Sequence, residues 1–176
     1  LNLYDTNRSN GTAKMTVTGG TFANFNPANC QAEGANTNFC AEGYSTKQED
    51  ENYTVMGPVA AIGEHNYATL SAAVEAAGNE TVTLLKDSVE AITIPADKTI
   101  TLDLNGHKIV NSSTAQDETV ADNLRKHTIT NNGTLTIMDS VGTGVVDNVS
   151  HGRAALYNAG TISEIKGGKF TRSVDN

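Results

Sequence analysis

The chain has 176 residues, of which 38% are hydrophobic and only 5% aromatic, with no Trp. Its 12 Lys and Arg against 20 Asp and Glu give a formal net charge of -8. This charge repels nucleic-acid phosphates and anionic lipid, and so argues against both as partners. No run approaches the roughly 18 apolar residues of a membrane span. The sequence starts without Met and inside a strand-like pattern, so we expect a segment of a longer protein.

The first third of the chain combines short strand patterns with a polar loop. We expect strands within residues 1–25, because Lys14 to Thr18 alternates and Thr21-Phe22 resumes after Gly19-Gly20. After an irregular loop, strand patterns in residues 44–55 flank a polar run, which predicts a hairpin. Gly57-Pro58 then interrupts the chain, and we place a domain boundary there, giving domains 1–57 and 58–176.

One helix and a series of very short strands follow. Leu70, Ala73, Val74 and Ala77 recur at spacings of three and four, so we predict a short capping helix near 67–78. From residue 81 the apolar period changes to two, and each run ends near Asn, Asp or Gly. We predict strands over 81–85, 92–94, 99–104, 134–137 and 161–165.

Two sequence units recur at a distance. Val17-Thr18-Gly19-Gly20-Thr21-Phe22 is similar to Ile165-Lys166-Gly167-Gly168-Lys169-Phe170, and Asn132-Gly133-Thr134 is similar to Ala159-Gly160-Thr161. Stacked rungs of a solenoid explain such units, because no rung buries its apolar side alone. An antiparallel sandwich also uses Asn-Gly turns and alternating strands and is the alternative fold. The brevity of the strands and the scarcity of aromatic residues favour the solenoid.

These residues carry a resemblance to a known type of module. Tyr67-Ala68-Thr69-Leu70, Thr81-Val82-Thr83-Leu84-Leu85 and Ile100-Thr101-Leu102-Asp103-Leu104-Asn105-Gly106 resemble the opening of right-handed parallel β-helix modules in large repeat-bearing, adhesin-like surface proteins of gut bacteria. Residues 15–55 resemble the closing end of such a module. The resemblance implies an all-β, right-handed parallel β-helix, with closing rungs and a hairpin in 1–57 and a capping helix and opening rungs in 58–176.

We expect a non-catalytic, structural or adhesive segment at the bacterial cell surface, outside the cell and without a cofactor. Rungs at the two ends have unpaired edges, and such edges are templates for further strand pairing. We therefore expect copies to stack head to tail into dimers or filaments, and possible further partners are a host glycan or surface protein. The residues expected at these contacts are Val17, Phe22, Ile165 and Phe170.

Cys30 and Cys40 lie in one short polar loop with no His or further Cys nearby. We therefore favour a disulfide over a metal site. Its closure would stabilise the fold by roughly 3 kcal/mol in the chain-entropy account and would indicate an oxidising compartment. Two unrelated thiols are the alternative.

Other chemistry is weakly indicated. A pectate-lyase-like polysaccharide lyase or hydrolase needs clustered carboxylates, for which Asp103 and Asp139 are the best pair. The histidines, His65, His107, His127 and His151, show no metal-ligand spacing. Calcium would find oxygen ligands only at Asp147-Asn148 or in residues 49–51. A carbohydrate-binding module would use exposed tyrosines, and the candidates are Tyr4, Tyr44, Tyr53, Tyr67 and Tyr157.

Overall fold

A computed structural model of the chain describes residues 1–31, 34–111, 119 and 121–173. The chain forms two compact units, Leu1–Pro58 and Val59–Asn176. The division lies one residue beyond the boundary that Gly57-Pro58 predicts. The protein is mostly β with several sheets, as the sequence predicts at this level.

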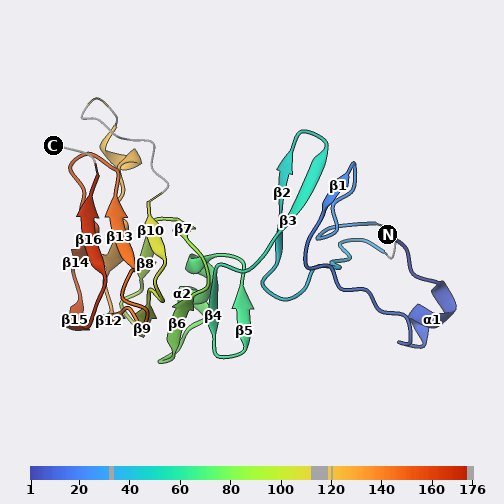
Figure 1. Cartoon of the computed structure of the whole chain (residues 1–176), viewed down its shortest axis with the longest axis horizontal. Helices are drawn as coiled ribbons and strands as arrows, with labels where there is room; N and C mark the ends of the chain where they lie inside the picture. Colours follow the sequence, from blue (N-terminus) through green and yellow to red (C-terminus); the bar gives the residue numbers. More distant parts are fainter. Residues whose placement is uncertain (32–33, 112–118, 120, 174–176) are drawn as a thin grey trace. The chain divides into compact units, whose positions relative to one another are not determined.

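The first unit is built on a three-stranded antiparallel sheet in the order β1-β3-β2 (Figure 1). The predicted hairpin is present, because β2 pairs with β3 in antiparallel register. Val17, Cys30, Phe39 and Val55 form a small buried cluster beside the sheet. The elements of this unit are α1 Asp5–Ser9, β1 Thr21–Ala23, β2 Ser45–Glu49 and β3 Asn52–Met56.

The prediction of strands throughout residues 1–25 is wrong in part. Asp5–Ser9 is a helix that buries none of its residues, so its sequence carries no apolar period to reveal it. From the expected strand of Lys14 to Thr18, only Val17 makes an isolated bridge, with Cys40. The Gly-Gly-Thr-Phe unit continues into β1, which pairs antiparallel with β3 rather than with a parallel rung.

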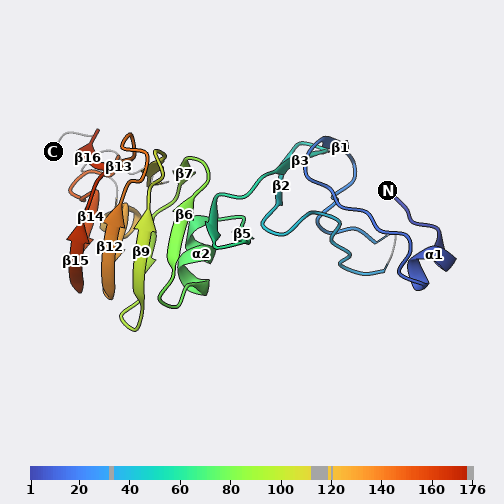
Figure 2. The same ribbon diagram turned by 60° about the horizontal axis from the view of Figure 1, so that its bottom comes forward.

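The second unit contains three sheets of mainly parallel strands. Sheet I has the order β15-β12-β9-β6-β4-β5, sheet II β16-β13-β10-β7 and sheet III β14-β11-β8. Figure 2 shows β15, β12, β9 and β6 side by side. The elements are β4 Ala60–Ile62, β5 His65–Tyr67, α2 Leu70–Ala76, β6 Thr81–Leu84, β7 Ser88–Val89, β8 Ile92–Ile94, β9 Thr99–Asp103, β10 Lys108–Val110, the short 3₁₀ turn Asp122–Leu124, β11 Ile129–Asn131, β12 Thr134–Met138, β13 Val145–Asn148, β14 Leu156–Asn158, β15 Thr161–Ile165 and β16 Lys169–Arg172.

The chain visits sheets I, II and III in turn, and we call one such circuit a rung. Rungs comprise β6-β7-β8, β9-β10-β11, β12-β13-β14 and finally β15-β16. Every strand from β6 to β13 pairs in parallel with the third strand after it in the chain. Equivalent residues of successive rungs therefore lie on top of one another.

Apolar residues at equivalent positions form the continuous core of this unit. One row runs through Val82, Leu102 and Ile137, all fully buried. A second row joins Ile109 to Val146, and a third joins Ile92 to Ile129. Short strands are enough to build this core. Each strand contributes only one or two inward side chains, and these become buried when the rungs stack.

Glycine permits the close approach of rungs at the corner before sheet I. A Cβ on Gly133 would lie 2.2 Å from the carbonyl oxygen of Pro95, and one on Gly160 would lie 2.2 Å from that of Gly133. These contacts are with backbone atoms, which cannot rotate away. The recurring Gly before a Thr-rich strand is thus explained by backbone packing between rungs.

Candidate functional site

The C-terminal edge of the second unit is where all three core rows end. The row through Ile137 ends at Ile165, the row through Val146 ends at Phe170, and the row through Ile129 ends at Leu156. Ile137, Val146 and Ile129 are fully buried, whereas Ile165 is 48% exposed. The apolar stack therefore reaches solvent at this edge.

A groove of about 420 Å³ follows this edge. Leu156, Ile165 and Phe170 line it together with Ala154, Ala155, Thr171 and Arg172. The three outermost strands, β14, β15 and β16, each have a partner on only one side among the described residues. We call this surface the C-terminal edge groove. In it, apolar side chains lie next to the outer edges of these three strands.

The direction of the amides of β16 can be read from its hydrogen bonds. Lys169 N donates to Gly144 O at 2.8 Å, and Ser173 N donates to Asn148 O at 3.0 Å. Since successive backbone amides of a strand alternate in direction, the N–H groups of Phe170 and Arg172 point away from β13. The N–H of Phe170 is the donor that an added strand would use.

The opposite end of the stack is covered. Helix α2 buries Leu70, Ala73 and Val74 against the core. Glu90 fixes the start of this helix, because its carboxylate accepts hydrogen bonds from Leu70 N and Ser71 N at 2.8 and 3.0 Å. Burial alone would raise the pKa of Glu90, but these bonds and those from the Ser71 and Ser88 hydroxyls outweigh it and lower the pKa.

The first unit places its predicted contact residues differently. Val17 belongs to the buried cluster, and Phe22 packs against that cluster with its ring centroid 6.2 Å from that of Phe25. Neither side chain is as available as Ile165. What β1 retains is a backbone edge, because in the described chain it pairs with β3 only.

Asp103 and Asp139, the predicted carboxylate pair, lie on neighbouring rungs and hold each other's turns. Asp103 accepts from Asn105 N and from Ser140 N of the next rung. Asp139 accepts from Gly144 N at 2.7 Å and from Gly106 N of the preceding rung at 2.8 Å. The two carboxylates thus cap turns across rungs as well as locally.

The predicted disulfide is absent from the structure. Cys30 and Cys40 are both free thiols. The two residues take part in separate backbone β-bridges, because Cys30 pairs with Thr37 and Cys40 pairs with Val17. Burial raises the pKa of the Cys40 thiol, which disfavours the thiolate and with it oxidation.

The residues considered for calcium already have protein donors. Asp147 is buried and accepts from Lys108 Nζ at 2.9 Å and from the hydroxyls of Thr171 and Ser173. Glu49 pairs with Lys47 at the surface. Within the described residues there is no group of three or more His, Cys, Asp or Glu placed to hold a metal ion.

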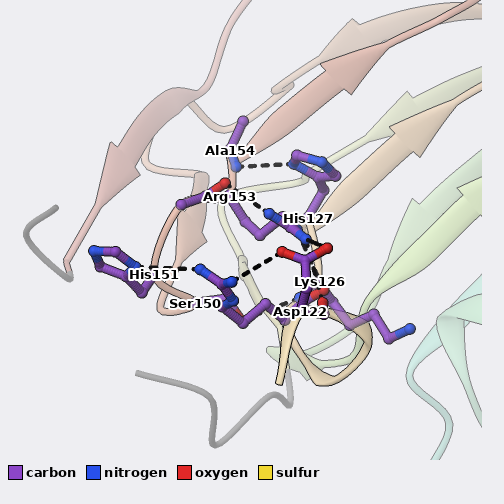
Figure 3. A network of polar contacts seen from close by, with 9 residues as sticks. Asp122, Lys126, His127, Ser150, His151, Arg153 and Ala154 are labelled. Carbon is purple, nitrogen blue, oxygen red and sulfur yellow. Dashed lines mark hydrogen bonds and ion pairs between the residues drawn. The ribbon is translucent and has the colours of Figure 1, made fainter. Parts of the chain in front are cut away.

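Two of the histidines meet in a polar cluster that the sequence did not indicate. Figure 3 shows His127, His151, Arg153 and Asp122 close together. His127 also stacks on Tyr157, with ring centroids 4.5 Å apart. The spacing between successive rungs is the sequence signal that could have revealed this cluster. Thr134 pairs with Thr161 and Thr130 with Tyr157 at the same spacing, which brings residue 127 near residues 154–157.

The other two histidines and the other tyrosines lie elsewhere. His65 is in β5, and His107 lies with its Nδ1 3.5 Å from Asp87. Tyr4 is exposed, while Tyr44, Tyr53 and Tyr67 are half-buried. Only Tyr157 combines exposure with an aromatic neighbour among the described residues.

No family model, curated protein or solved structure matches this chain. Among the described residues, no helix is both long and apolar enough to span a membrane.

Proposed function

We propose that the second unit is a segment of a right-handed parallel β-helix, and that the chain is a non-catalytic structural and adhesive segment of an extracellular bacterial surface protein. Parallel pairing between strands three elements apart supports the β-helix. The backbone contacts at Gly133 and Gly160 support it as well, because they repeat at one corner of successive rungs. The cell-surface assignment rests on the resemblance of the sequence.

The proposed activity is self-association through the C-terminal edge groove. One observation carries it: all three core rows end at this edge in partly exposed apolar residues, Leu156, Ile165 and Phe170. A further strand set placed here would bury these side chains and pair with the outward-pointing N–H of Phe170 in β16. A second copy of the chain supplies both strand edges and apolar side chains.

Two arrangements of the copies follow from the available edges. Pairing of β16 with β1 of another copy, the arrangement that the sequence predicts, is head to tail and continues into filaments. Pairing of two C-terminal edges is two-fold and closes into a dimer. Both require the C-terminal edge groove, and only the first requires β1.

Sedimentation velocity over a range of concentrations tests the proposal. We expect the wild-type mass to rise with concentration and Ile165→Lys to stay monomeric, because a charge in the groove would lose its hydration on pairing. Val141→Lys is the matched control, since Val141 is 61% exposed in a turn away from the groove. A wild-type protein that remains monomeric at every concentration contradicts the proposal.

A second variant separates the two arrangements. Asn24 N donates to Glu51 O towards β3, so by alternation the N–H of Ala23 points to the free edge of β1. Ala23→Pro removes this donor from an edge strand, where Pro is tolerated. Filaments that disappear in this variant indicate head-to-tail pairing, whereas dimers that persist indicate pairing of two C-terminal edges.

A further inference from the structure

A second groove, of about 400 Å³, lies on the outer face of sheet III, apart from the core. Thr93 and Thr130 form part of its floor, and Arg125, Lys126 and His127 form part of its wall. Its volume falls within the range of small-molecule sites, roughly 300–1,000 Å³. We call it the sheet III groove.

The floor continues as a row of outward-facing side chains. Thr93, Thr130 and Tyr157 occupy equivalent positions on β8, β11 and β14. They face outward because the flanking Ile92 and Ile129 are buried and alternate residues of a strand point to opposite faces. Two hydroxyl groups therefore lie in line with a tyrosine ring that is 48% exposed.

His127 gives this row an oriented donor. Ala154 N donates to His127 Nδ1 at 2.9 Å, so Nδ1 is an acceptor and the ring proton lies on Nε2. Burial and the positive charge of Arg153 lower the pKa of His127, which favours the neutral ring. The imidazole is stacked on Tyr157 with an interplanar angle of 16°, so each ring covers one face of the other.

Among the described residues, the wall carries more positive than negative charge. Asp122 accepts from Arg125 at 2.9 Å and from Arg153 at 2.8 Å, so one carboxylate faces two guanidinium groups (Figure 3). The ammonium of Lys126 has no partner among the described residues. The buried Nε of Arg125 likewise lacks a hydrogen-bond acceptor. Glu75 lines the adjoining hollow, which also includes Thr93.

This set of groups has the chemistry of a site for an acidic sugar. Aromatic faces pack against the apolar face of a sugar ring, and Thr hydroxyls and the Nε2–H of His127 match its hydroxyl groups. Lys126 and Arg125 supply the positive charge that a carboxylate or sulfate needs. A net charge of -8 makes such a local cationic wall unexpected from composition alone.

We propose that the sheet III groove binds an anionic oligosaccharide, with the sugar ring against the exposed part of Tyr157 and the acidic group at Lys126. The lining residues of the two grooves differ, but Tyr157 lies in β14 at the C-terminal edge, so binding is measured on the monomer. Its occupant is a glycan carrying carboxylate or sulfate groups, and the probes below distinguish these two sources.

Isothermal titration calorimetry with three probes tests the site. The protein is used at a concentration at which it is monomeric; if the wild type associates at every usable concentration, the Ile165→Lys variant takes its place. The probes are trigalacturonic acid, a sulfated heparin disaccharide and the neutral maltotriose. We expect at least one anionic probe to bind and maltotriose to bind more weakly. Binding only of trigalacturonic acid identifies a carboxylate as the recognised group, and binding only of the heparin disaccharide identifies a sulfate.

Matched variants locate the binding. Lys126→Gln is expected to weaken the affinity for the anionic probe by about tenfold, because a charge-assisted hydrogen bond is lost. Tyr157→Ala is expected to weaken it by a similar factor. Lys166→Gln is the control, since Lys166 pairs with Glu164 outside the groove. Equal thermal midpoints of all proteins show that folding is unchanged.

Three results would overturn the proposal. The first is that neither anionic probe binds. The second is that maltotriose binds as tightly as the anionic probes. The third is that Lys126→Gln binds like Lys166→Gln, which would place the anion elsewhere on the chain.

Discussion

The carboxylate of Asp139 shows how a single side chain joins two rungs. It accepts from Gly106 N of one rung and from Gly144 N of the next, both within 2.8 Å. Burial raises the pKa of Asp139, but these backbone donors together with those of Gly142 and Val141 outweigh it and lower the pKa below 3.8. The charged form is therefore favoured in the folded state.

Asp139→Asn is expected to lower the free energy of unfolding by about 1–3 kcal/mol, because an amide accepts fewer and weaker hydrogen bonds from these amides. Urea denaturation followed by circular dichroism measures the change. Asp97→Asn is the matched control, as Asp97 lies exposed in a turn. Equal losses in the two variants would mean that the contacts of Asp139 add nothing to stability.

The effect of Asp139→Asn should depend on pH. A carboxylate whose pKa is lowered on folding contributes stability that is fully present above its unfolded value, near 3.8, and is lost as the pH falls through the folded value. The difference between wild type and variant should therefore be largest near neutral pH and shrink in acid below pH 3.8. A difference that stays constant down to pH 2 would contradict this role.

At the scale of the element, the corners decide whether rungs stack. Gly133 precedes β12, and a Cβ there would approach two carbonyl oxygens, those of Pro95 at 2.2 Å and Lys98 at 2.5 Å. Thr134 N donates to the same Lys98 oxygen, so the backbones cannot separate without breaking a ladder bond. The corner therefore has no room for a side chain.

Gly133→Ala is expected to destabilise the second unit by about 3 kcal/mol or more, because the clash is with backbone that has no alternative rotamer. The thermal midpoint measures the loss. In Gly19→Ala, the control, the new Cβ meets nothing within 4 Å and the backbone φ is not positive. A thermal midpoint of Gly133→Ala equal to that of the wild type would contradict the close backbone contact at this corner.

Sequence patterns identified those elements whose apolar residues alternate over four residues or more, together with the hairpin and helix α2. The patterns of residues 81–85, 99–104, 134–137 and 161–165 correspond to β6, β9, β12 and β15, all in sheet I. In sheet III the pattern of residues 92–94 corresponds to β8. The strands β7, β10, β11 and β14 were not predicted, because two or three residues are too few to show a period. Polar inward residues also interrupt strands of sheets II and III, such as the buried Asn131 and Asn148.

At the scale of the whole molecule, helix α2 covers one end of the core of the second unit, and no described element covers the other. Residues Ile165 and Phe170 were predicted as contact residues from the Gly-Gly-x-Phe unit, and the structure places both in the C-terminal edge groove. The same unit at Val17 and Phe22 packs into its own small cluster instead. The shared Gly-Gly-x-Phe pattern pairs differently in the two places, because the neighbour of β1 is β3 of a hairpin and not a parallel rung.

The cationic wall of the sheet III groove depends on residues far apart in sequence. Asp122 and Arg153 meet only because the rungs stack. Single histidines and arginines in the sequence carry no such information. Alignment of the rungs at Asn132-Gly133 and Ala159-Gly160 would have placed His127 beside Ala154 and Tyr157.

Hydrogen exchange at the amide of Phe170, resolved by NMR, tests the C-terminal edge as a pairing surface most directly. This N–H points away from β13, whereas Lys169 N donates to Gly144 O. We predict that exchange at Phe170 is fast in dilute protein and slows as the concentration rises, while exchange at Leu135 in the interior strand β12 stays constant. An exchange rate at Phe170 that does not change with concentration, in a protein whose Lys169 amide is protected, would contradict self-association through this edge.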